Sequence, residues 1–427
     1  MENKDNRSSD SPLIFLSAGD PSGDVHAAKL VEELAAVMPN ARFVGFAGPK
    51  TAATRCDVRF DLTQFAVMML KRALLNLPTY ARILRDADRL FRNERPDLVI
   101  LVDFPSFNWK IAQKAKAAGI PVVYFMPPQI WGWGQWRVKK MRKYVDLTLS
   151  CFSFEDEWFR ERGCHSVLIG HPFFEEARSR HIDQAFLESL NSQETGVSSS
   201  AFHPDRGKIK YLTALPGSRD QEVTNNLETL LATIGKVINK ASDVKPVFAA
   251  FRDSHAEYIR NELKKRGLNY PVYVGKTPEL LRAAYCCLGV SGSVSIELLS
   301  LCKPTVIIYR ISKLEFFVLR FLKRVKYMTL TNLLYVHGLE GETPFYPKRR
   351  LPERTDHTPK EREMMIFPEF ITKGDCSEDA ANCLLAWLEN DETRRLCVEK
   401  LERLKQENDF VDSPIKLAAQ KIVERFL

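Results

Sequence analysis

A series of short apolar runs, separated by amphipathic segments, constrains the fold of this chain more than any other feature. In the first half, runs rich in Leu, Ile, Val and Phe are expected to form strands at residues 13–18, 42–48, 97–103, 121–126, 146–152 and 167–170. Helical spacing of apolar residues lies between most of them, around residues 24–37, 78–94, 106–118, 136–144 and 153–162. Continuously apolar strands alternating with helices indicate a parallel sheet covered on both faces, so we predict a doubly wound α/β domain.

A second series of the same kind follows residues 191–208, which are poor in apolar residues and predict a linker or an exposed loop. Its expected strands lie at residues 209–215, 246–251, 271–275, 286–290 and 304–309. We therefore expect two Rossmann-like domains facing a cleft, with ligands at the carboxyl ends of the strands. The expected parts are a disordered tail (1–12), an N-terminal domain (13–178), a helix and linker (179–208), a C-terminal domain (209–395) with a surface insertion (335–365), and C-terminal helices (396–427). The sequence leaves open whether the helix expected at residues 412–427 packs back on the N-terminal domain or on a partner chain.

Composition narrows the class of protein. The chain has 427 residues, and 62 Lys and Arg against 54 Asp and Glu give a net charge of +8, which favours an anionic partner without identifying it. No run approaches the length of a membrane-spanning helix. The cysteines are scattered and form no C-x-x-C pair, which fits a reduced, cytoplasmic compartment. We expect no nucleic-acid partner, no metal site and no cofactor, because no motif for any of them occurs.

Two loops after expected strands of the second half carry the residue types of an anion site. In LPGSRDQEV (215–223), Gly217 permits close backbone approach, Ser218 offers a hydroxyl and Arg219 can bind a phosphate with two hydrogen bonds. In SGSVSIELL (291–299), small residues precede a helix, and Glu297 one turn along can accept hydrogen bonds from ribose hydroxyls. An ordinary turn and a capped helix are the alternatives. The other residues expected at this nucleotide site are Glu222, Ser291, Gly292, Ser293 and Tyr309.

Candidate residues of the first half also follow expected strands. Asp103 ends a buried run, where a carboxylate can act as a general base or simply cap the next helix. Trp131 lies in PPQIWGWGQWRVKK (127–140), where exposed Trp beside basic residues would suit an amphiphile and buried Trp would be core. For His171, in Gly-His-Pro, a helper role and a structural turn are both open. Asn332, a polar residue among apolar neighbours, is by itself more typical of a turn amide than of a ligand.

Together these loops resemble the lipid A disaccharide synthases, which adopt the two-domain glycosyltransferase B fold. The resemblance covers roughly residues 13–372 and rests on the order of its motifs, since each alone is weak. In chain order they are AGDPSGD (18–24), GFAGP (45–49), LVDFPSFN (101–108), PPQIWGWGQWRVKKM (127–141), GHP (170–172), LPGSRDQEV (215–223), SGSVSIELL (291–299), YRIS (309–312), TNLL (331–334) and PEF (368–370).

The resemblance implies an inverting hexosyltransferase of lipid A biosynthesis. UDP-2,3-diacylglucosamine would give its sugar to the 6-hydroxyl of 2,3-diacylglucosamine 1-phosphate, yielding a β-1,6-linked disaccharide phosphate and UDP. Asp103 would be the general base, Arg219 and Asn332 would be catalytic residues handling nucleotide or substrate, and Glu297 would hold the ribose. Since this fold holds the nucleotide in its second domain, the loop AGDPSGD is not expected to bind UDP. The residues expected to line the acceptor side of the cleft are Gly19, Ser22, Gly23, Asp24, Trp131 and His171.

Acylated substrates would explain why a cytoplasmic protein carries two apolar and basic segments, at 65–78 and 316–327. We expect both segments to meet the cytoplasmic surface of the inner membrane, to which the protein would bind peripherally. The residues expected at this surface are Met68, Met69, Leu70, Lys71, Arg72, Phe316, Arg320, Lys323 and Arg324. A homodimer is left open.

Two other functions remain open at the level of sequence. The first keeps the fold and changes the substrate, to another UDP-sugar enzyme such as a wall N-acetylglucosaminyltransferase or a UDP-sugar 2-epimerase. The second is a catalytically silent, membrane-associated binding protein on the same scaffold. Loss of Asp103, Arg219 or Glu297 would have favoured the second, and all three are present.

Overall fold

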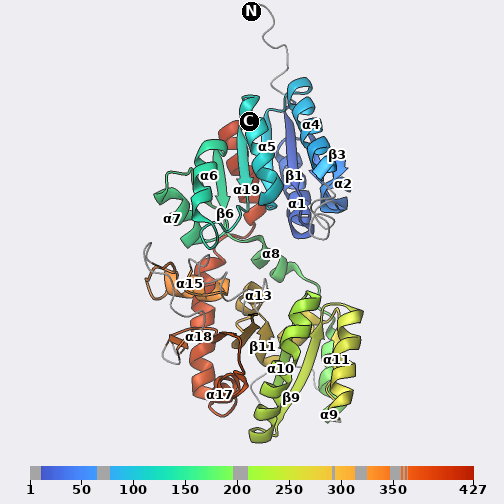
Figure 1. Ribbon diagram of the computed structural model, residues 1–427, viewed down its shortest axis with the longest axis vertical. Helices are drawn as coiled ribbons and strands as arrows, with labels where there is room; N and C mark the ends of the chain where they lie inside the picture. The colour runs from blue at the N-terminus through green and yellow to red at the C-terminus, as the bar shows by residue number, and fades with distance from the viewer. Residues whose placement is uncertain are drawn as a thin grey trace, which may run out of the picture. The chain divides into compact units, whose positions relative to one another are not determined.

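The computed structural model describes residues 11–64, 77–195, 210–290, 294–312, 325–346, 357–358, 361–362 and 364–427. The chain divides into two compact units (Figure 1). Unit 1 consists of Met1–Glu175 and Asn408–Leu427, and unit 2 consists of Glu176–Glu407. The residues we expected at the membrane, from Met68 to Arg72 and from Phe316 to Arg324, lie outside the described residues, as do Ser291, Gly292 and Ser293.

Unit 1 is built on a seven-stranded parallel sheet in the order β3-β2-β1-β4-β5-β6-β7. Its strands are β1 (Leu13–Ala18), β2 (Arg42–Ala47), β3 (Cys56–Asp61), β4 (Leu98–Val102), β5 (Val122–Phe125), β6 (Leu147–Ser150) and β7 (Ser166–Leu168). Its helices are α1 (Pro21–Val37), α2 (Pro49–Ala52), α4 (Leu77–Asn93), α5 (Pro105–Ala117), η1 (Gln135–Arg137), α6 (Val138–Tyr144), α7 (Ser153–Glu161) and α19 (Pro414–Phe426), with α8 (Pro172–Ser179) crossing into unit 2.

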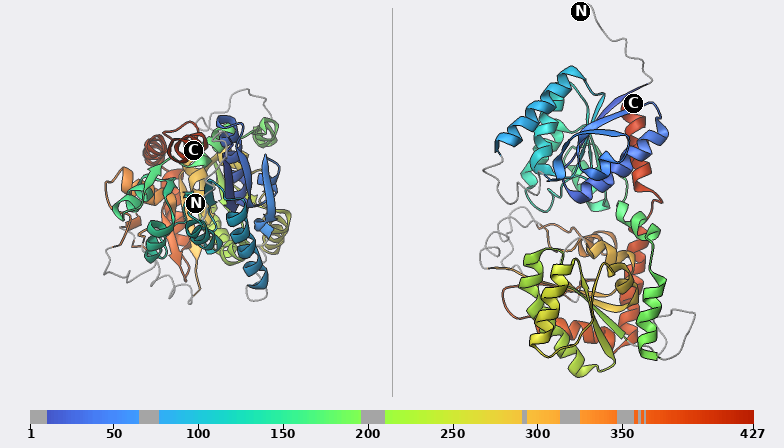
Figure 2. Two further views of the ribbon diagram at one scale, coloured as in Figure 1. Left: turned by 90° about the horizontal axis from the view of Figure 1, so that it is seen from above. Right: turned by 90° about the vertical axis from the view of Figure 1, so that its right-hand side faces the viewer.

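Unit 2 repeats the plan with a six-stranded parallel sheet in the order β10-β9-β8-β11-β12-β13. Its strands are β8 (Lys210–Leu215), β9 (Val244–Ala250), β10 (Val272–Val274), β11 (Ala284–Val290), β12 (Thr305–Arg310) and β13 (Glu369–Thr372). Its helices are α9 (Gln184–Thr195), α10 (Asp220–Lys240), α11 (Asp253–Lys265), α12 (Thr277–Ala283), α13 (Val294–Ser300), α15 (Leu330–Gly338), α17 (Ser377–Leu388) and α18 (Asp391–Asn408). In each unit helices cover both faces of the sheet (Figure 2), which confirms the predicted doubly wound architecture.

The central strands are apolar along their whole length because both of their faces are buried. Every residue of β1 and of β4 is buried, and each fully buried Leu or Ile side chain contributes about 1.5–3 kcal/mol. Gly45 lets β2 approach β1 closely, since a Cβ built there would lie 2.3 Å from the carbonyl oxygen of Leu16. A side chain at position 45 would therefore separate the two strands.

The last helix of the chain completes the core of the first unit. Ser413 caps α19 by accepting a hydrogen bond from the amide of Lys416, and Pro414 occupies the first turn. Ala418 and Ala419 of α19, with Ile415 and Ile422, join the core cluster that contains α1 residues such as Leu30 and Leu34. Of the helices expected in residues 396–427, α18 belongs to unit 2, whereas α19, red in Figure 1, lies with unit 1, which is the first of the two alternatives left open for it.

Two further differences concern the ends of the sheets and the expected insertion. Strands β3 and β13 were not predicted, and α15 includes Tyr335–Gly338, the start of the segment that we expected to be an insertion.

The described helices are all too short or too polar to cross a membrane.

Candidate active site

In each sheet, one pair of adjacent strands forms a switch point: after one strand the chain continues toward one edge of the sheet, and after the other it continues toward the opposite edge. In doubly wound folds, ligands bind at such a switch point. In unit 1 the pair is β1 and β4, where Ala18 lies opposite Val102. Asp20 lies two positions after Ala18, and Asp103 directly follows Val102. The topology therefore brings two carboxylates to one edge of the sheet.

Asp103 is held in an unusual backbone conformation by hydrogen bonds to its carbonyl oxygen. Its φ is 45° and that of Phe104 is 43°, a left-handed conformation that costs a non-glycine residue about 1–2 kcal/mol. The Tyr124 hydroxyl and the Asn108 Nδ2 each donate to the Asp103 carbonyl oxygen at 2.7 Å. Asn108 is itself fixed, because its Oδ1 accepts a 2.6 Å hydrogen bond from the buried Ser17 hydroxyl. These contacts set the direction in which Asp103 leaves the sheet.

The environment of Asp103 suits a general base near neutral pH. The pKa of its carboxyl is raised to about 6, chiefly by burial and then by the negative charge of Asp20, while a hydrogen bond from the Phe104 amide opposes the shift. Burial also raises the pKa of Asp20. The N-cap position of α5 is Phe104, with no side-chain capping bond, so the alternative of Asp103 as a simple helix cap is not what the structure has. A base with this pKa is largely ionised at neutral pH and still binds a proton readily.

Much of the loop AGDPSGD has a structural role within unit 1. Asp24 is buried and accepts hydrogen bonds from the amides of Gly48, Lys50 and Thr51 and, at 2.6 Å, from the Thr51 hydroxyl. Four donors occupy the carboxylate, so Asp24 ties α1 to α2 instead of binding a sugar. Gly19 and Gly23 are buried as well, whereas Ser22 is exposed.

Glycine is required at position 19 by the neighbouring ring of Phe104. A Cβ built on Gly19 would lie 2.1 Å from that ring. Gly23 packs nearby, since a Cβ there would lie 3.6 Å from the Cβ of Asp103. Both glycines therefore shape the surroundings of Asp103.

Trp131 is a core residue, which corrects its assignment to the acceptor side. It is 2% exposed, its ring lies edge-on to Phe154 at 4.9 Å, and its Nε1 donates to Glu155 at 2.9 Å. Burial raises the pKa of Glu155 to about 7. The exposed indole of the same stretch is Trp136, at 62%.

His171 takes the structural role that the sequence left open. Its ring stacks on Phe152 with a centroid separation of 5.1 Å, and its Nδ1 accepts a hydrogen bond from the amide of Phe173. Burial and the neighbouring His26 lower its pKa to about 3, so the ring is neutral at physiological pH. A neutral ring that shapes the turn before α8 does not supply charge to a substrate.

The switch point of unit 2 lies between β8 and β11, where Leu215 pairs with Gly289. In the loop after β8, Gly217 has a φ of 111°, and a Cβ there would lie 2.7 Å from the Cβ of Glu222. Glu222 Oε2 accepts the amides of Ser218 and Arg219 at 3.0 and 3.2 Å. Glu222 thus organises the loop, and its expected contact with the nucleotide stays a prediction.

Arg219 remains available to a ligand. Its side chain is 80% exposed, and its one ion pair with a described residue is the 2.8 Å contact to Glu222. Ser218 is exposed beside it. A guanidinium anchored on one side and open on the other can bind a phosphate.

Glu297 projects from α13, the helix that follows β11 at the same switch point. Its side chain is 13% exposed and pairs with Arg180. Burial raises the pKa of Glu297, and Arg180 opposes that shift. The sequence did not identify Arg180 as a site residue, because no motif marks it.

Asn332 and Tyr309 are more buried than we expected of residues that bind a ligand. Asn332 is fully buried; its Nδ2 donates to Phe367 O and Glu369 Oε1 at 2.7 and 2.8 Å, and its Oδ1 accepts the Phe367 amide at 3.0 Å. These bonds occupy the amide, so Asn332 fixes the segment before β13. Tyr309 is half-buried against the core of unit 2.

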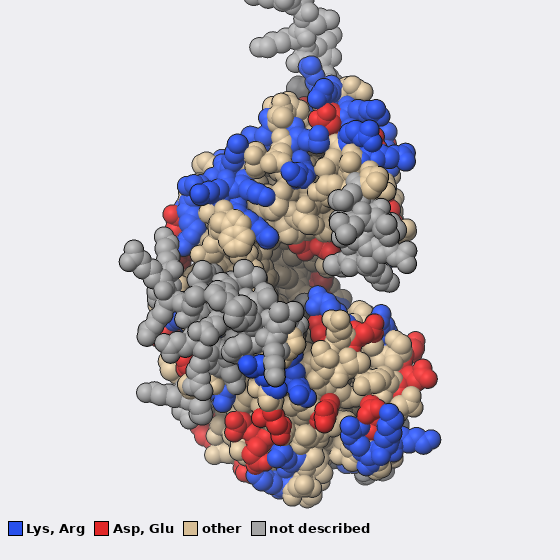
Figure 3. All heavy atoms as spheres, in the orientation of Figure 1, with Lys and Arg blue, Asp and Glu red and all other residues tan. Residues whose placement is uncertain are grey.

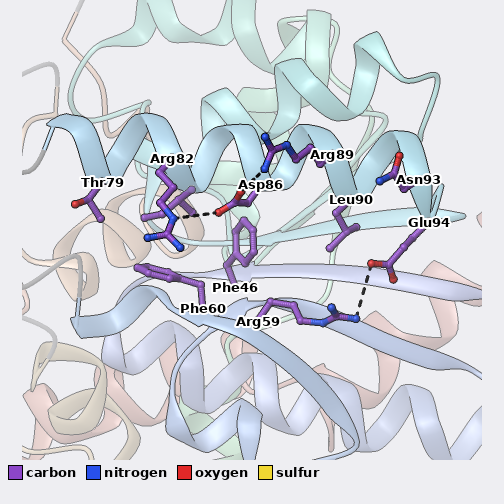
Figure 4. A pocket seen from close by; sticks show the side chains of 11 residues that line it. Phe46, Arg59, Phe60, Thr79, Arg82, Asp86, Arg89, Leu90, Asn93 and Glu94 are labelled. Atoms are coloured by element: carbon purple, nitrogen blue, oxygen red, sulfur yellow. Dashed lines mark ion pairs between the residues drawn. The ribbon is translucent and has the colours of Figure 1, made fainter.

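A pocket of about 460 Å³ lies elsewhere in unit 1, between α4 and strands β2 and β3 (Figure 4). Phe46 and Phe60 lie on its strand side, and Asp86 lies between Arg82 and Arg89 on its helix side. None of the residues predicted to act in catalysis lines this pocket.

Within the described part of the chain, no group of three or more His, Cys, Asp or Glu side chains is arranged to hold a metal ion.

The chain is similar to known proteins over most of its length. Residues 14–343 match the sequence model of the family described as lipid-A-disaccharide synthetase. A lipid-A-disaccharide synthase from Myxococcus xanthus is 31% identical over 323 residues, which cover 76% of this chain and 81% of the relative.

Solved structures of low sequence identity share the fold. A putative UDP-N-acetylglucosamine 2-epimerase from Listeria monocytogenes is 12% identical with a TM-score of 0.56, and covers 98% of this chain and 96% of its own. The glycotransferase of kitacinnamycin is 14% identical with a TM-score of 0.57, covering 98% and 99%. These likenesses show the glycosyltransferase B architecture alone, whereas the sequence matches show the family. The chain therefore belongs to the lipid-A-disaccharide synthetase family of glycosyltransferases.

Proposed function

We propose that the protein transfers the sugar of UDP-2,3-diacylglucosamine to the 6-hydroxyl of 2,3-diacylglucosamine 1-phosphate. The products are a β-1,6-linked disaccharide phosphate and UDP. The observation that carries this proposal is Asp103, a carboxyl with a pKa of about 6 held at the switch point of unit 1 in a chain of this family. Arg219, exposed at the switch point of unit 2, supports it.

The chemistry is a single displacement with one base. Asp103 removes the proton of the acceptor 6-hydroxyl as its oxygen attacks the anomeric carbon from the face opposite UDP. The bond from that carbon to the diphosphate oxygen breaks, and its electron pair leaves with UDP. Arg219 stabilises the charge that develops on the diphosphate.

The proposal is tested by incubating the protein in mixed micelles with both acylated substrates, with EDTA present. Equal amounts of UDP and of a disaccharide phosphate, identified by mass spectrometry, are the expected result. Release of UDP without a disaccharide, or epimerised UDP-sugar, would instead favour another UDP-sugar enzyme of this fold. UDP binding without turnover of any of these substrates would favour a silent binding protein.

The pH dependence of the reaction follows from the carboxyl pair. Since the base must be ionised, kcat/KM is expected to fall about tenfold per pH unit below the Asp103 pKa of about 6. Replacing Asp20 with Asn removes a charge that raises this pKa, so the acid limb is expected to move to lower pH. A pH–rate profile of both proteins checks this prediction, and an acid limb at the same pH in both would contradict it.

We also propose that unit 1 binds an anionic membrane surface, which would give access to acylated substrates. Figure 3 shows Lys and Arg gathered over the part of unit 1 that contains α6. Four of these residues, Lys139, Lys140, Arg142 and Lys143, are exposed and form no ion pair with a described carboxylate. Trp136 precedes them, with the Arg137 guanidinium 5.6 Å from the centre of its ring. Exposed Trp among cations is typical of a surface that meets lipid headgroups.

This basic helix begins at the reactive end of the sheet. Residues Gln135–Arg137 (η1) come after β5, and Asp103 comes after the adjacent strand β4. Because the carboxyl ends of parallel strands share one edge, membrane contact at η1, from which α6 runs back toward the start of β6, would lie on the side of unit 1 that carries the base. The expected membrane segments 65–78 and 316–327 would add to this contact.

Replacing Lys139, Lys140 and Lys143 together with Gln is expected to weaken binding to phosphatidylglycerol vesicles about 100-fold, at about 1 kcal/mol per charge. Sedimentation with vesicles measures the loss. The matched control replaces exposed Lys240, Lys264 and Lys265 of unit 2 with Gln and is expected to bind as the wild type does. Equal losses in both variants would show dependence on net charge alone, and unchanged binding by the α6 variant would contradict the proposed surface.

A further inference from the structure

An ion pair in unit 2 joins Glu297 to a residue far away in the sequence. Arg180 lies in the connection between α8 and α9, and its Nη1 donates a hydrogen bond to Glu297 Oε1. The Arg180 side chain is 33% exposed and that of Glu297 is 13% exposed. The pair is therefore partly desolvated, which strengthens it relative to a surface pair.

The other carboxylate oxygen of Glu297 is open. Oε2 accepts no hydrogen bond from the described residues, although an ionised carboxylate has several acceptor positions. Burial alone would drive this carboxyl toward its neutral form, and Arg180 counteracts that effect on its pKa. The ion pair thus leaves the second carboxylate oxygen of Glu297 without a hydrogen bond from the described residues.

The backbone that presents Arg180 is anchored to unit 2. The amide of Asp183 donates to Glu279 Oε1 of α12 at 3.0 Å, and the Asp183 carboxylate accepts Lys276 Nζ at 2.5 Å. Asp183 Oδ1 also accepts the amide of Phe186 at the start of α9. Because these bonds lie three positions from Arg180, its guanidinium reaches Glu297 from a fixed point of the chain.

We infer that Arg180 is a positioning residue of the nucleotide site, which keeps Glu297 ionised and turned so that its open oxygen accepts a ribose hydroxyl of the UDP-sugar. The inference rests on the proposed function, because it assigns Arg180 to the donor site of that reaction. The inference predicts a difference between ligands that a purely structural role of Arg180 would not produce. If Arg180 acts through a hydrogen bond from Glu297 to the ribose, a nucleotide that lacks a ribose hydroxyl depends less on Arg180.

The test measures affinity for UDP and for 2′-deoxyuridine diphosphate by calorimetry. Replacing Arg180 with Met is expected to weaken UDP binding about tenfold, the size of one hydrogen bond to a charged group, and to affect the 2′-deoxy ligand much less. Arg180→Lys is expected to restore most of the affinity for UDP. In a Glu297→Gln background, Arg180→Met is expected to have no further effect. Lys236→Met, which removes a cation paired with Glu378 elsewhere in unit 2, is the matched control and is expected to bind as the wild type does.

Three results would overturn the inference. These are unchanged or tighter UDP binding by Arg180→Met, equal losses for both ligands, and a full effect of Arg180→Met in the Glu297→Gln background. Tighter binding would mean that Arg180 competes with the ribose. Thermal unfolding of each variant separates a loss of folding from a loss of affinity, and Arg180→Lys keeps the test valid if the Met variant unfolds. Failure of the wild-type chain to bind UDP would overturn the proposed function itself, and this inference with it.

Discussion

Replacing Asp103 with Asn is expected to lower the rate of sugar transfer about 10³-fold while leaving the affinity for UDP unchanged. The amide has the shape of the carboxyl but cannot accept the proton of the acceptor hydroxyl. The fold is expected to survive, because Tyr124 and Asn108 hold the backbone carbonyl of Asp103 and not its side chain. Turnover in mixed micelles and UDP calorimetry on the same preparation measure the two effects.

The control for Asp103 makes the same substitution at the end of another strand of unit 1. Asp61 ends β3, and its carboxylate accepts the amides of Thr63 and Gln64. Asp61→Asn is expected to turn over within a few-fold of the wild type. An Asp103→Asn protein that failed to bind UDP, or that kept its full rate, would show that the base is assigned to the wrong residue.

Replacing Arg219 with Met is expected to lower the rate about 10²- to 10³-fold and to weaken UDP binding. Its guanidinium is exposed and anchored by Glu222, so it can meet the charge that appears on the departing diphosphate. Arg219→Lys is expected to recover part of the rate, because a point charge replaces a planar group that binds with two hydrogen bonds. Steady-state kinetics with saturating acceptor separate the effects on kcat and KM.

The variant Glu222→Gln tests whether activity depends on the Arg219 guanidinium itself or on the way Glu222 holds its loop. Glu222 receives the amides of Ser218 and Arg219, and the Gln oxygen can accept the same bonds. This variant is expected to lose far less activity than Arg219→Met. If the two variants lost equal activity, the anchoring of the guanidinium by the Glu222 carboxylate, and not the guanidinium alone, would explain the requirement for Arg219.

The sequence was sufficient to predict the strands that are buried on both faces, because each of them is a continuous apolar run. It was not sufficient for β3, with the sequence Cys-Asp-Val-Arg-Phe-Asp at the edge of its sheet, where half-exposed positions alternate with polar residues. Strand β13 was missed for a different reason. It is short, and its first residue is a buried Glu369 that the amides of Met328 and Thr329 satisfy.

The sequence located candidate residues by type and position, but it could not show whether their hydrogen-bonding capacity was already used. Asp24 and Asn332 both have the chemistry of ligand-binding residues, and local backbone amides, carbonyls or carboxylates occupy both. Asp20 could have been found, because a doubly wound order places its strand beside that of Asp103. No sequence signal pointed to Arg180, which meets Glu297 only through tertiary structure.

The most direct test of a single displacement at Asp103 is the anomeric configuration and linkage of the product, determined by NMR. From the α-linked UDP-sugar, attack by the acceptor oxygen with one base predicts a β linkage to the 6-position. An α-linked product would require two successive displacements, or attack on the same face as the leaving UDP. That result would contradict the role of Asp103 as the single base, and a β-1,6 linkage would support it.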